Sequence, residues 1–303
     1  MKKILALYRK TLKPLAIEEI FDVYFFRIFS FILVLPLNKT KFSPTYFTLL
    51  SMISGITSGI FFAQGNYKGL LYGALALGVT NIFDCADGQL ARLTQKNSKF
   101  GKTLDGLADL ITYISIYTGI SWHLYVQGYP IWIFIYGFIS MMFMFIHIIY
   151  FDHFKNEYIS YVHPKYNEKS EKLDELEKKY TSLKKKNDSK WILAYLYFLF
   201  YKIEYLLVSF SYPENYKGYH SIYDNKRKPT NKIIINYSSM KNIVRLWTFF
   251  GATSHIMIFL IFAILNIPLL IFHFISIIYN IALVTLILIQ KKKFKTLFNL
   301  SSL

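Results

Sequence analysis

Stretches of predominantly apolar residues, each close to the length that crosses a bilayer, recur along the chain and are separated by polar connections. A helix needs about 20 residues to span roughly 30 Å of hydrocarbon. Six stretches meet that length, at residues 45–64, 68–87, 103–126, 129–150, 244–265 and 268–290. The pattern predicts an all-α fold, that of a polytopic membrane protein with six transmembrane helices.

Two further apolar stretches, residues 21–37 and 191–210, contain charges near their middle. The charged residues are Asp22, Arg27, Lys202 and Glu204. Charged side chains are costly inside a bilayer, but they are common on helices that lie in its interface. We therefore predict an interfacial helix in each place, with a membrane-spanning helix as the alternative.

Residues 151–242 form the longest non-membrane segment that the pattern predicts. Near its centre, apolar residues at alternating spacings of three and four make one stripe on a charged helix. The stripe consists of Leu173, Leu176, Tyr180 and Leu183. It either pairs with its copy in a dimer or lies on the cytoplasmic face of its own chain.

These elements predict five segments in chain order. They are an N-terminal cytoplasmic and interfacial segment, four spans, a basic cytoplasmic helical insert, two spans and a basic tail, at residues 1–44, 45–150, 151–242, 243–290 and 291–303.

The composition agrees with the membrane prediction. Of the 303 residues, 54% are hydrophobic and 19% are aromatic, and the mean hydropathy is positive, which is too apolar for an ordinary soluble domain. The formal net charge is +17, but no zinc-finger spacing or other nucleic-acid signature accompanies it. We therefore expect no nucleic-acid partner, and we assign the charge to an anionic lipid surface.

Lysine and arginine are concentrated in alternate connections. The connection between the second and third stretches, the long one after the fourth and the C-terminal tail are basic, whereas the remaining short connections contain one lysine, Lys68. The positive-inside rule then places both termini, and the aspartate-containing segment 83–110, on the cytoplasmic side. The abundance of Lys, Ile, Asn, Phe and Tyr is typical of an AT-rich genome, which favours the plasma membrane of a prokaryote.

Cys85 is the single cysteine, so an intrachain disulfide is excluded and we expect the thiol to act as a small packing residue. The first 20 residues contain basic side chains but no continuous apolar core that ends in a small-residue cleavage site. We therefore expect no removable signal peptide.

Four aspartates stand at the edges of the second and third apolar stretches. Asp84 and Asp87 are three residues apart, and Asp105 and Asp109 are four apart, so in helices each pair shares a face. Each ionised aspartate at depth costs on the order of 2.5–3.5 kcal/mol on insertion scales, and clustering adds mutual repulsion. Solvated acids paired with basic neighbours are the structural alternative. Divalent cations would cancel the repulsion, and hard oxygen ligands favour Mg²⁺ or Mn²⁺, with Ca²⁺ as a competitor, over zinc.

The connector between the two pairs suits a phosphate-bearing group. Gly88 removes a side chain next to a candidate ligand, and Ala91 keeps the next turn small, so a flat or bulky group can approach the helix. Arg92 offers a forked cation that suits phosphate. Ser98 can hydrogen-bond an oxygen, and Gly101 allows a close turn into the next helix. Each residue alone would be a packing or turn residue, but together with four acids they describe a metal-bound diphosphate site.

The motif resembles the signature of the CDP-alcohol phosphotransferases, also called CDP-alcohol phosphatidyltransferases. It runs as Asp84-x2-Asp87-Gly88-x2-Ala91-Arg92-x8-Gly101-x3-Asp105-x3-Asp109, with all eight signature positions filled. Upstream, the sequence FSPTYFTLLSMISG resembles the Pro-Asn-x-x-Thr start of the family's first span, with Thr45 where asparagine is usual. The resemblance covers most of the membrane part and does not extend to the segment at about 151–235.

The resemblance implies a homodimeric integral membrane enzyme with a cytoplasm-facing active site in each protomer. Two Mg²⁺ or Mn²⁺ ions would be bound by Asp84, Asp87, Asp105 and Asp109, and Asp109 would also be the catalytic general base. The CDP pocket would be lined by Gly88, Ala91, Arg92, Ser98 and Gly101. The implied reaction transfers a substituted phosphate, most often phosphatidyl from CDP-diacylglycerol, to an alcohol with release of CMP, as in phospholipid biosynthesis.

The acceptor alcohol stays open among serine, choline, glycerol phosphate, inositol phosphate and polar sugar alcohols. Arg245 begins the fifth stretch and would either meet an anionic acceptor or anchor a helix end. His255 lies inside that stretch, either as a structural hydrogen bond or near the acceptor pocket.

Three alternative functions stay open. Some relatives use a soluble CDP-alcohol donor with a lipid acceptor, and a non-catalytic membrane scaffold would share the same fold. A cation channel or transporter would instead place its acids near the bilayer midplane, between broken helices.

Overall fold

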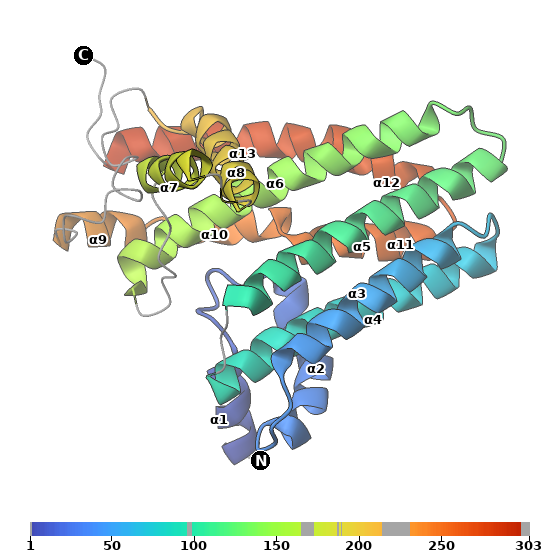
Figure 1. Ribbon diagram of the computed structural model, residues 1–303, viewed down its shortest axis with the longest axis horizontal. Coiled ribbons are helices and arrows are strands. Elements are labelled where there is room, and N and C mark those ends of the chain that lie inside the picture. The colour runs from blue at the N-terminus through green and yellow to red at the C-terminus, as the bar shows by residue number, and fades with distance from the viewer. Residues whose placement is uncertain are drawn as a thin grey trace. The chain divides into compact units, whose positions relative to one another are not determined.

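The computed structural model describes residues 2–95, 99–164, 173–186, 188, 190–213 and 231–297. Over these residues the chain forms helices joined by turns and loops, without a β-strand (Figure 1). The predicted all-α class is therefore confirmed. The chain divides into two compact units, which comprise Met1–Phe145 with Thr248–Ile281 and Ile146–Trp247 with Ala282–Leu303.

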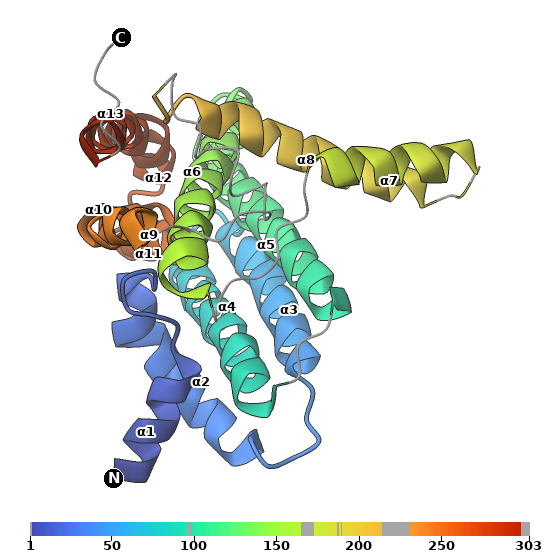
Figure 2. The same cartoon turned by 90° about the vertical axis from the view of Figure 1, so that its left-hand side faces the viewer.

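The first unit holds the helices that surround the aspartate motif. They are α1 (Lys2–Thr11), a π-helical turn (Asp22–Phe26), α2 (Arg27–Val34), α3 (Pro44–Phe62), α4 (Tyr67–Thr94), α5 (Lys99–Val126), the start of α6 (Ile133–Val162), α11 (Ala252–Ile264) and α12 (Leu269–His273). Helices α3, α4 and α5 run side by side, as Figure 1 and Figure 2 both show. Helices α1, α2 and α11 also contact α4, so α4 is the centre of this unit.

Local signals explain why the motif lies in one unbroken helix. Asn66 is the N-cap of α4, and its side chain accepts a hydrogen bond from the Gly69 backbone N–H at 2.8 Å. At the other end Gln95 adopts a left-handed conformation with φ of 56°, which ends the helix. The residues from Asp84 to Arg92 therefore keep helical spacing throughout.

Helices α3 and α5 approach each other closely at small residues. A Cβ atom on Gly59 would lie 2.1 Å from the Ser115 hydroxyl and 2.4 Å from the Ser115 carbonyl oxygen. Gly55 stands one turn earlier and faces Thr112 in the same way. Glycines four residues apart let helix backbones meet in a membrane, where packing rather than hydrophobicity drives helix association. This contact joins the helices that carry Thr48 and Asp105.

The second unit contains the rest of α6 and the helices of the predicted insert. They are α7 (Leu173–Lys185), α8 (Trp191–Ser209), α9 (Asn231–Ser238), α10 (Lys241–Trp247) and most of α13 (Tyr279–Leu297). Figure 2 shows α7 beside α8. Leu176 of the apolar stripe is buried, and the Tyr180 ring contacts the rings of Tyr195 and Phe198. The stripe therefore packs on a helix of its own chain.

A buried carboxylate ties this unit together. Glu157 of α6 accepts hydrogen bonds from the hydroxyls of Tyr212 at 2.6 Å and Tyr237 at 2.5 Å. Because a buried charge is costly unless it is hydrogen-bonded, the two tyrosines stabilise α6 against the segments that follow α8 and precede α10.

Candidate membrane spans follow from helix length and composition over the described residues. Five helices qualify, namely α3, α4, α6, α8 and the continuous segment Leu269–Leu297, and the bent pair Lys241–Phe250 with Ala252–Ile264 would make a sixth. This supports a multi-pass membrane protein. Two details differ from the sequence prediction. The helix α5, which contains the predicted span 103–126, does not qualify, because polar residues from Asp105 to His123 recur along it. The helix α8 qualifies, although we predicted that 191–210 lies in the interface.

Candidate metal centre and donor site

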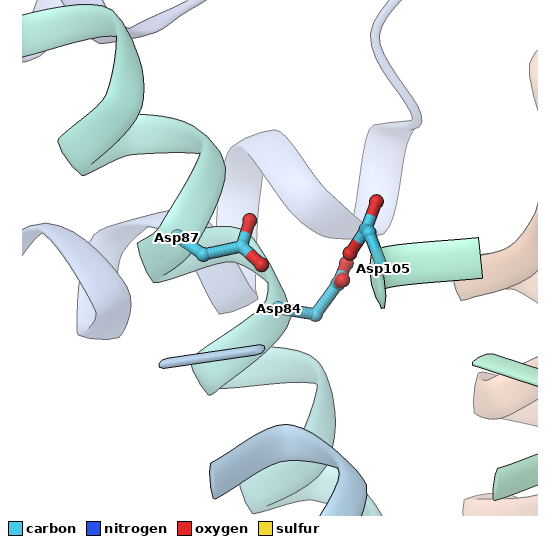
Figure 3. Close-up of side chains that lie close together, drawn as sticks. All are labelled: Asp84, Asp87 and Asp105. Carbon is cyan, nitrogen blue, oxygen red and sulfur yellow. The ribbon is translucent and has the colours of Figure 1, made fainter. Parts of the chain in front are cut away.

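Three of the four motif aspartates converge. Asp84 and Asp87 project from α4 and Asp105 projects from α5, and each offers an oxygen that lies within 4.8 Å of the others (Figure 3). The carboxylates point toward one another, and the three residues are half-buried. The spacing of three along α4 places both of its acids on the side that faces α5.

Asp109 lies one turn beyond Asp105 on α5 and is also half-buried. Its charge interacts with that of Asp84, but Asp109 is outside the group of three within 4.8 Å. The structure therefore brings three of the predicted ligands into one cluster and places the fourth next to it.

Thr48 is a site residue that the sequence interpretation did not single out. Its hydroxyl donates a hydrogen bond of 2.7 Å to Oδ2 of Asp87. The signal was present, because Thr48 fills the threonine position of the Pro-Asn-x-x-Thr pattern. Thr45 fills the asparagine position, and its hydroxyl accepts a hydrogen bond from Ser43 at 3.3 Å.

The donor set fits a hard divalent cation. Carboxylate oxygens are the ligands that Mg²⁺ and Mn²⁺ prefer, and three of them from two helices can reach one ion or a pair of ions after small side-chain rotations. Three half-buried carboxylates this close repel one another strongly unless a cation or a proton neutralises them. The geometry therefore agrees with the metal prediction.

Gly88 and Arg92 are neighbours in the structure as well as in the motif. A Cβ atom on Gly88 would lie 3.3 Å from Nη1 of Arg92, so the guanidinium lies over the glycine. The Arg92 Nε–H donates to the carbonyl oxygen of Thr11 at 2.5 Å. Ala91 is half-buried on the same helix. Gly101 lies in the first turn of α5, and Ser98 is outside the described residues.

The two predicted acceptor contacts have different environments. His255 is fully buried in α11, where its Nδ1–H donates to the Gly251 carbonyl oxygen at 2.8 Å and its ring makes a T-shaped contact with the ring of Tyr279. These contacts of His255 match the structural role that the sequence left open as an alternative. Arg245 lies in α10, in the second unit, and is half-buried.

The fold and the site define a helical membrane protein with a cluster of acidic residues, suited to bind a metal ion, between two of its helices. A model of the CDP-alcohol phosphatidyltransferase family matches residues 41–167, which include every motif position. The match of residues 41–167 agrees with the family resemblance that the motif carries.

Two known proteins are similar to a part of this chain. The chain is similar to a phosphatidylinositol phosphate synthase of Corynebacterium glutamicum, with 35% identity over 86 residues, which is 28% of this chain and 38% of that protein. It is also similar to a CDP-diacylglycerol–serine O-phosphatidyltransferase of Helicobacter pylori, with 38% identity over 79 residues, which is 26% of this chain and 32% of that protein. The chain thus spans about a third of the length of the relatives it matches.

Proposed function

We propose that this chain is an integral membrane phosphotransferase of phospholipid biosynthesis. It moves a substituted phosphate, the phosphatidyl group of CDP-diacylglycerol, to an alcohol and releases CMP. The observation that carries the proposal is the convergence of Asp84, Asp87 and Asp105 inside the segment that the CDP-alcohol phosphatidyltransferase model matches. The name of the Helicobacter pylori relative includes the same donor.

In this proposal the four aspartates hold two Mg²⁺ or Mn²⁺ ions. When bound, the metals neutralise the diphosphate and make CMP a better leaving group. The chain supplies the rest: Thr48 holds the Asp87 carboxylate in one rotamer through its hydrogen bond. Arg92 binds diphosphate oxygens, and the donor pocket is completed by Gly88, Ala91, Ser98 and Gly101.

Asp109 is the general base of the proposed reaction. It accepts the proton of the acceptor hydroxyl while that oxygen bonds to the phosphorus distal to cytidine. The bond between this phosphorus and the oxygen of CMP breaks, and CMP leaves with the electron pair. The position of Asp109 next to the cluster of three acids supports its assignment as the general base.

The acceptor is not assigned, because the two relatives are named for different alcohols. We propose that the site and both termini face the cytoplasm of a prokaryotic cell and that the protein is a homodimer. The basic connections support the orientation.

The test is CMP release by the purified protein in lipid, with CDP-diacylglycerol, Mg²⁺ or Mn²⁺, and acceptor alcohols offered one at a time. We expect release that requires one acceptor and stops with a chelator. If no acceptor alcohol supports CMP release, the proposed donor is wrong. A panel of soluble CDP-alcohols, each offered with diacylglycerol, would then distinguish an enzyme with a soluble donor and a lipid acceptor from a non-catalytic scaffold.

Asp109→Asn tests the proposed base in the same assay. We expect turnover to fall by at least about 100-fold, since general-base catalysis contributes that much or more, while the protein stays folded and monodisperse. Asp152→Asn is the matched control, because Asp152 is a half-exposed aspartate paired with Lys155. Full activity in Asp109→Asn would remove the proposed base.

A further inference from the structure

The N-terminal segment Thr11–Ser30 contacts a stripe of buried polar residues on α4. The stripe consists of Asn81, Cys85 and Gln89, which are spaced by four residues and are all buried. The sequence interpretation placed this segment at the membrane surface and gave it no part in the site. Its hydrogen bonds to α4 suggest another role.

Gln89 is the centre of these contacts. It is fully buried, and its Nε2 donates to the Arg27 carbonyl oxygen at 3.1 Å and to the Thr11 hydroxyl at 3.3 Å. Its Oε1 accepts a hydrogen bond from the Ser30 hydroxyl at 2.7 Å. Both ends of the Gln89 amide are therefore bonded to the N-terminal segment, which fixes Thr11 against α4.

Thr11 in turn orders Arg92, because the Arg92 Nε–H donates a hydrogen bond to the Thr11 carbonyl oxygen. An arginine side chain is long and loses considerable rotamer entropy when it is immobilised. With Nε bonded to Thr11, the two terminal nitrogens lie over Gly88. A guanidinium that is already ordered binds an anion with a smaller entropic cost.

The same segment also bonds to α11. Asp22 Oδ1 accepts hydrogen bonds from Asn81 Nδ2 at 3.2 Å and from the Thr253 hydroxyl at 2.8 Å. Glu19 Oε2 accepts from the Ser254 backbone N–H at 3.1 Å, in the first turn of α11. The segment is thus joined to two helices at several points, which is more than a surface anchor requires.

Arg27 is buried among these acids and does not suggest an anion site of its own. It pairs with Glu18 at 2.6 Å and lies 3.8 Å from Asp22. Burial disfavours its charge, but the two carboxylates outweigh burial and raise the Arg27 pKa above its ordinary value. Two acids around one cation leave no excess positive charge for a substrate phosphate.

We propose that the segment Thr11–Ser30 positions Arg92 for the CDP donor, with Gln89 and Ser30 as the positioning residues. The inference rests on the proposed function, because it assigns Arg92 to the donor diphosphate. The segment would act through the order of one arginine and would leave the metal ligands unchanged.

The test measures the dissociation constants for CDP, in the presence of Mn²⁺, and for Mn²⁺ alone, by calorimetric titration of the full chain. We expect Gln89→Met and Ser30→Ala each to raise the CDP constant by about 3- to 10-fold, as expected for one disordered side chain, with an unchanged Mn²⁺ constant. Arg92→Ala should raise the CDP constant further. In the Arg92→Ala background, Gln89→Met should have no additional effect, because both act through the same group.

Gln290→Met is the matched control. Gln290 is also a buried glutamine, and its Oε1 accepts a hydrogen bond from Trp247 Nε1 in the second unit. It should lower thermal stability without changing the CDP constant, which separates positioning from a loss of folding. An unchanged CDP constant in Gln89→Met, or additive effects of Gln89→Met and Arg92→Ala, would overturn the inference. If the wild-type protein bound Mn²⁺ but no CDP, the proposed function itself would be wrong.

Discussion

The hydrogen bond between Thr48 and Asp87 links the first residues of α3 to the acidic cluster. The bond occupies one lone pair of the carboxylate and restricts its rotamers, so the ligand is ordered before a metal arrives. Residues that orient metal ligands in this way commonly change metal affinity by about 10- to 100-fold when they are removed.

Thr48→Val keeps the shape of the side chain and removes the hydroxyl. We expect the dissociation constant for Mn²⁺ to rise by about 10-fold, measured from free Mn²⁺ by electron paramagnetic resonance. Thr57→Val is the control on the same helix, because the Thr57 hydroxyl donates to the carbonyl oxygen of Ile53 within that helix at 2.8 Å. Equal Mn²⁺ affinity in the wild type and Thr48→Val would show that the bond does not order the site.

At the scale of helices, the contact between α3 and α5 depends on glycine. Gly59 meets the backbone of Ser115, and Gly119 meets the carbonyl oxygen of Gly59, where a Cβ atom would lie only 2.3 Å away. Backbone atoms cannot rotate out of the way as a side chain can. A methyl group at either position would therefore separate the helices that carry Thr48 and Asp105.

Gly59→Ala is expected to destabilise the protein by about 1–3 kcal/mol, the usual cost of overpacking, and to weaken Mn²⁺ binding because the ligand helices move apart. Thermal unfolding in detergent and the Mn²⁺ titration measure the two effects. Gly78→Ala in α4 is the control, since within the described part of the chain a Cβ atom there would meet nothing within 4 Å apart from its chain neighbours and the backbone of its own helix. Similar stability of the two variants would contradict the proposed close contact.

At the scale of the whole molecule, the distribution of lysine and arginine predicts how the chain crosses the membrane. The two exposed residues Gln95 and Gln127 follow α4 and α5, respectively. The positive-inside rule puts Gln95 on the cytoplasmic side and Gln127 on the opposite side. If α5 does not span the membrane, both residues lie on the same side, so labelling also tests whether α5, which is long enough but too polar to qualify as a candidate span, crosses the membrane.

Gln95→Cys and Gln127→Cys, each made in a Cys85→Ala background, should react differently with a membrane-impermeant maleimide. We expect Gln127→Cys to be labelled in intact cells and Gln95→Cys to be labelled only after lysis. Labelling of both variants in intact cells, or of neither, would contradict the predicted crossing. The Cys85→Ala protein without a new cysteine provides the background signal.

Several features were predictable because they depend on local pattern. The length of the apolar stretches determined the all-α membrane class, and the helical spacing of the motif predicted that Asp84 and Asp87 share one face of a helix. The apolar stripe at Leu176 predicted an amphipathic helix. It did not determine the partner of that helix, because one apolar face packs equally well on a copy or on α8.

By itself, the sequence determined the class of fold, the family resemblance and the set of acids. Only the tertiary structure decided which distant residues complete the site. Thr48 and Asp87 are 39 positions apart, and Ser30 and Gln89 are 59 apart. Hydrogen bonds over such separations depend on which helix faces pack together. The periodicity of apolar residues within one helix does not determine which other helix it packs against. The buried amide of Gln89 shows the physical reason, since its partners exist only once the N-terminal segment lies against α4.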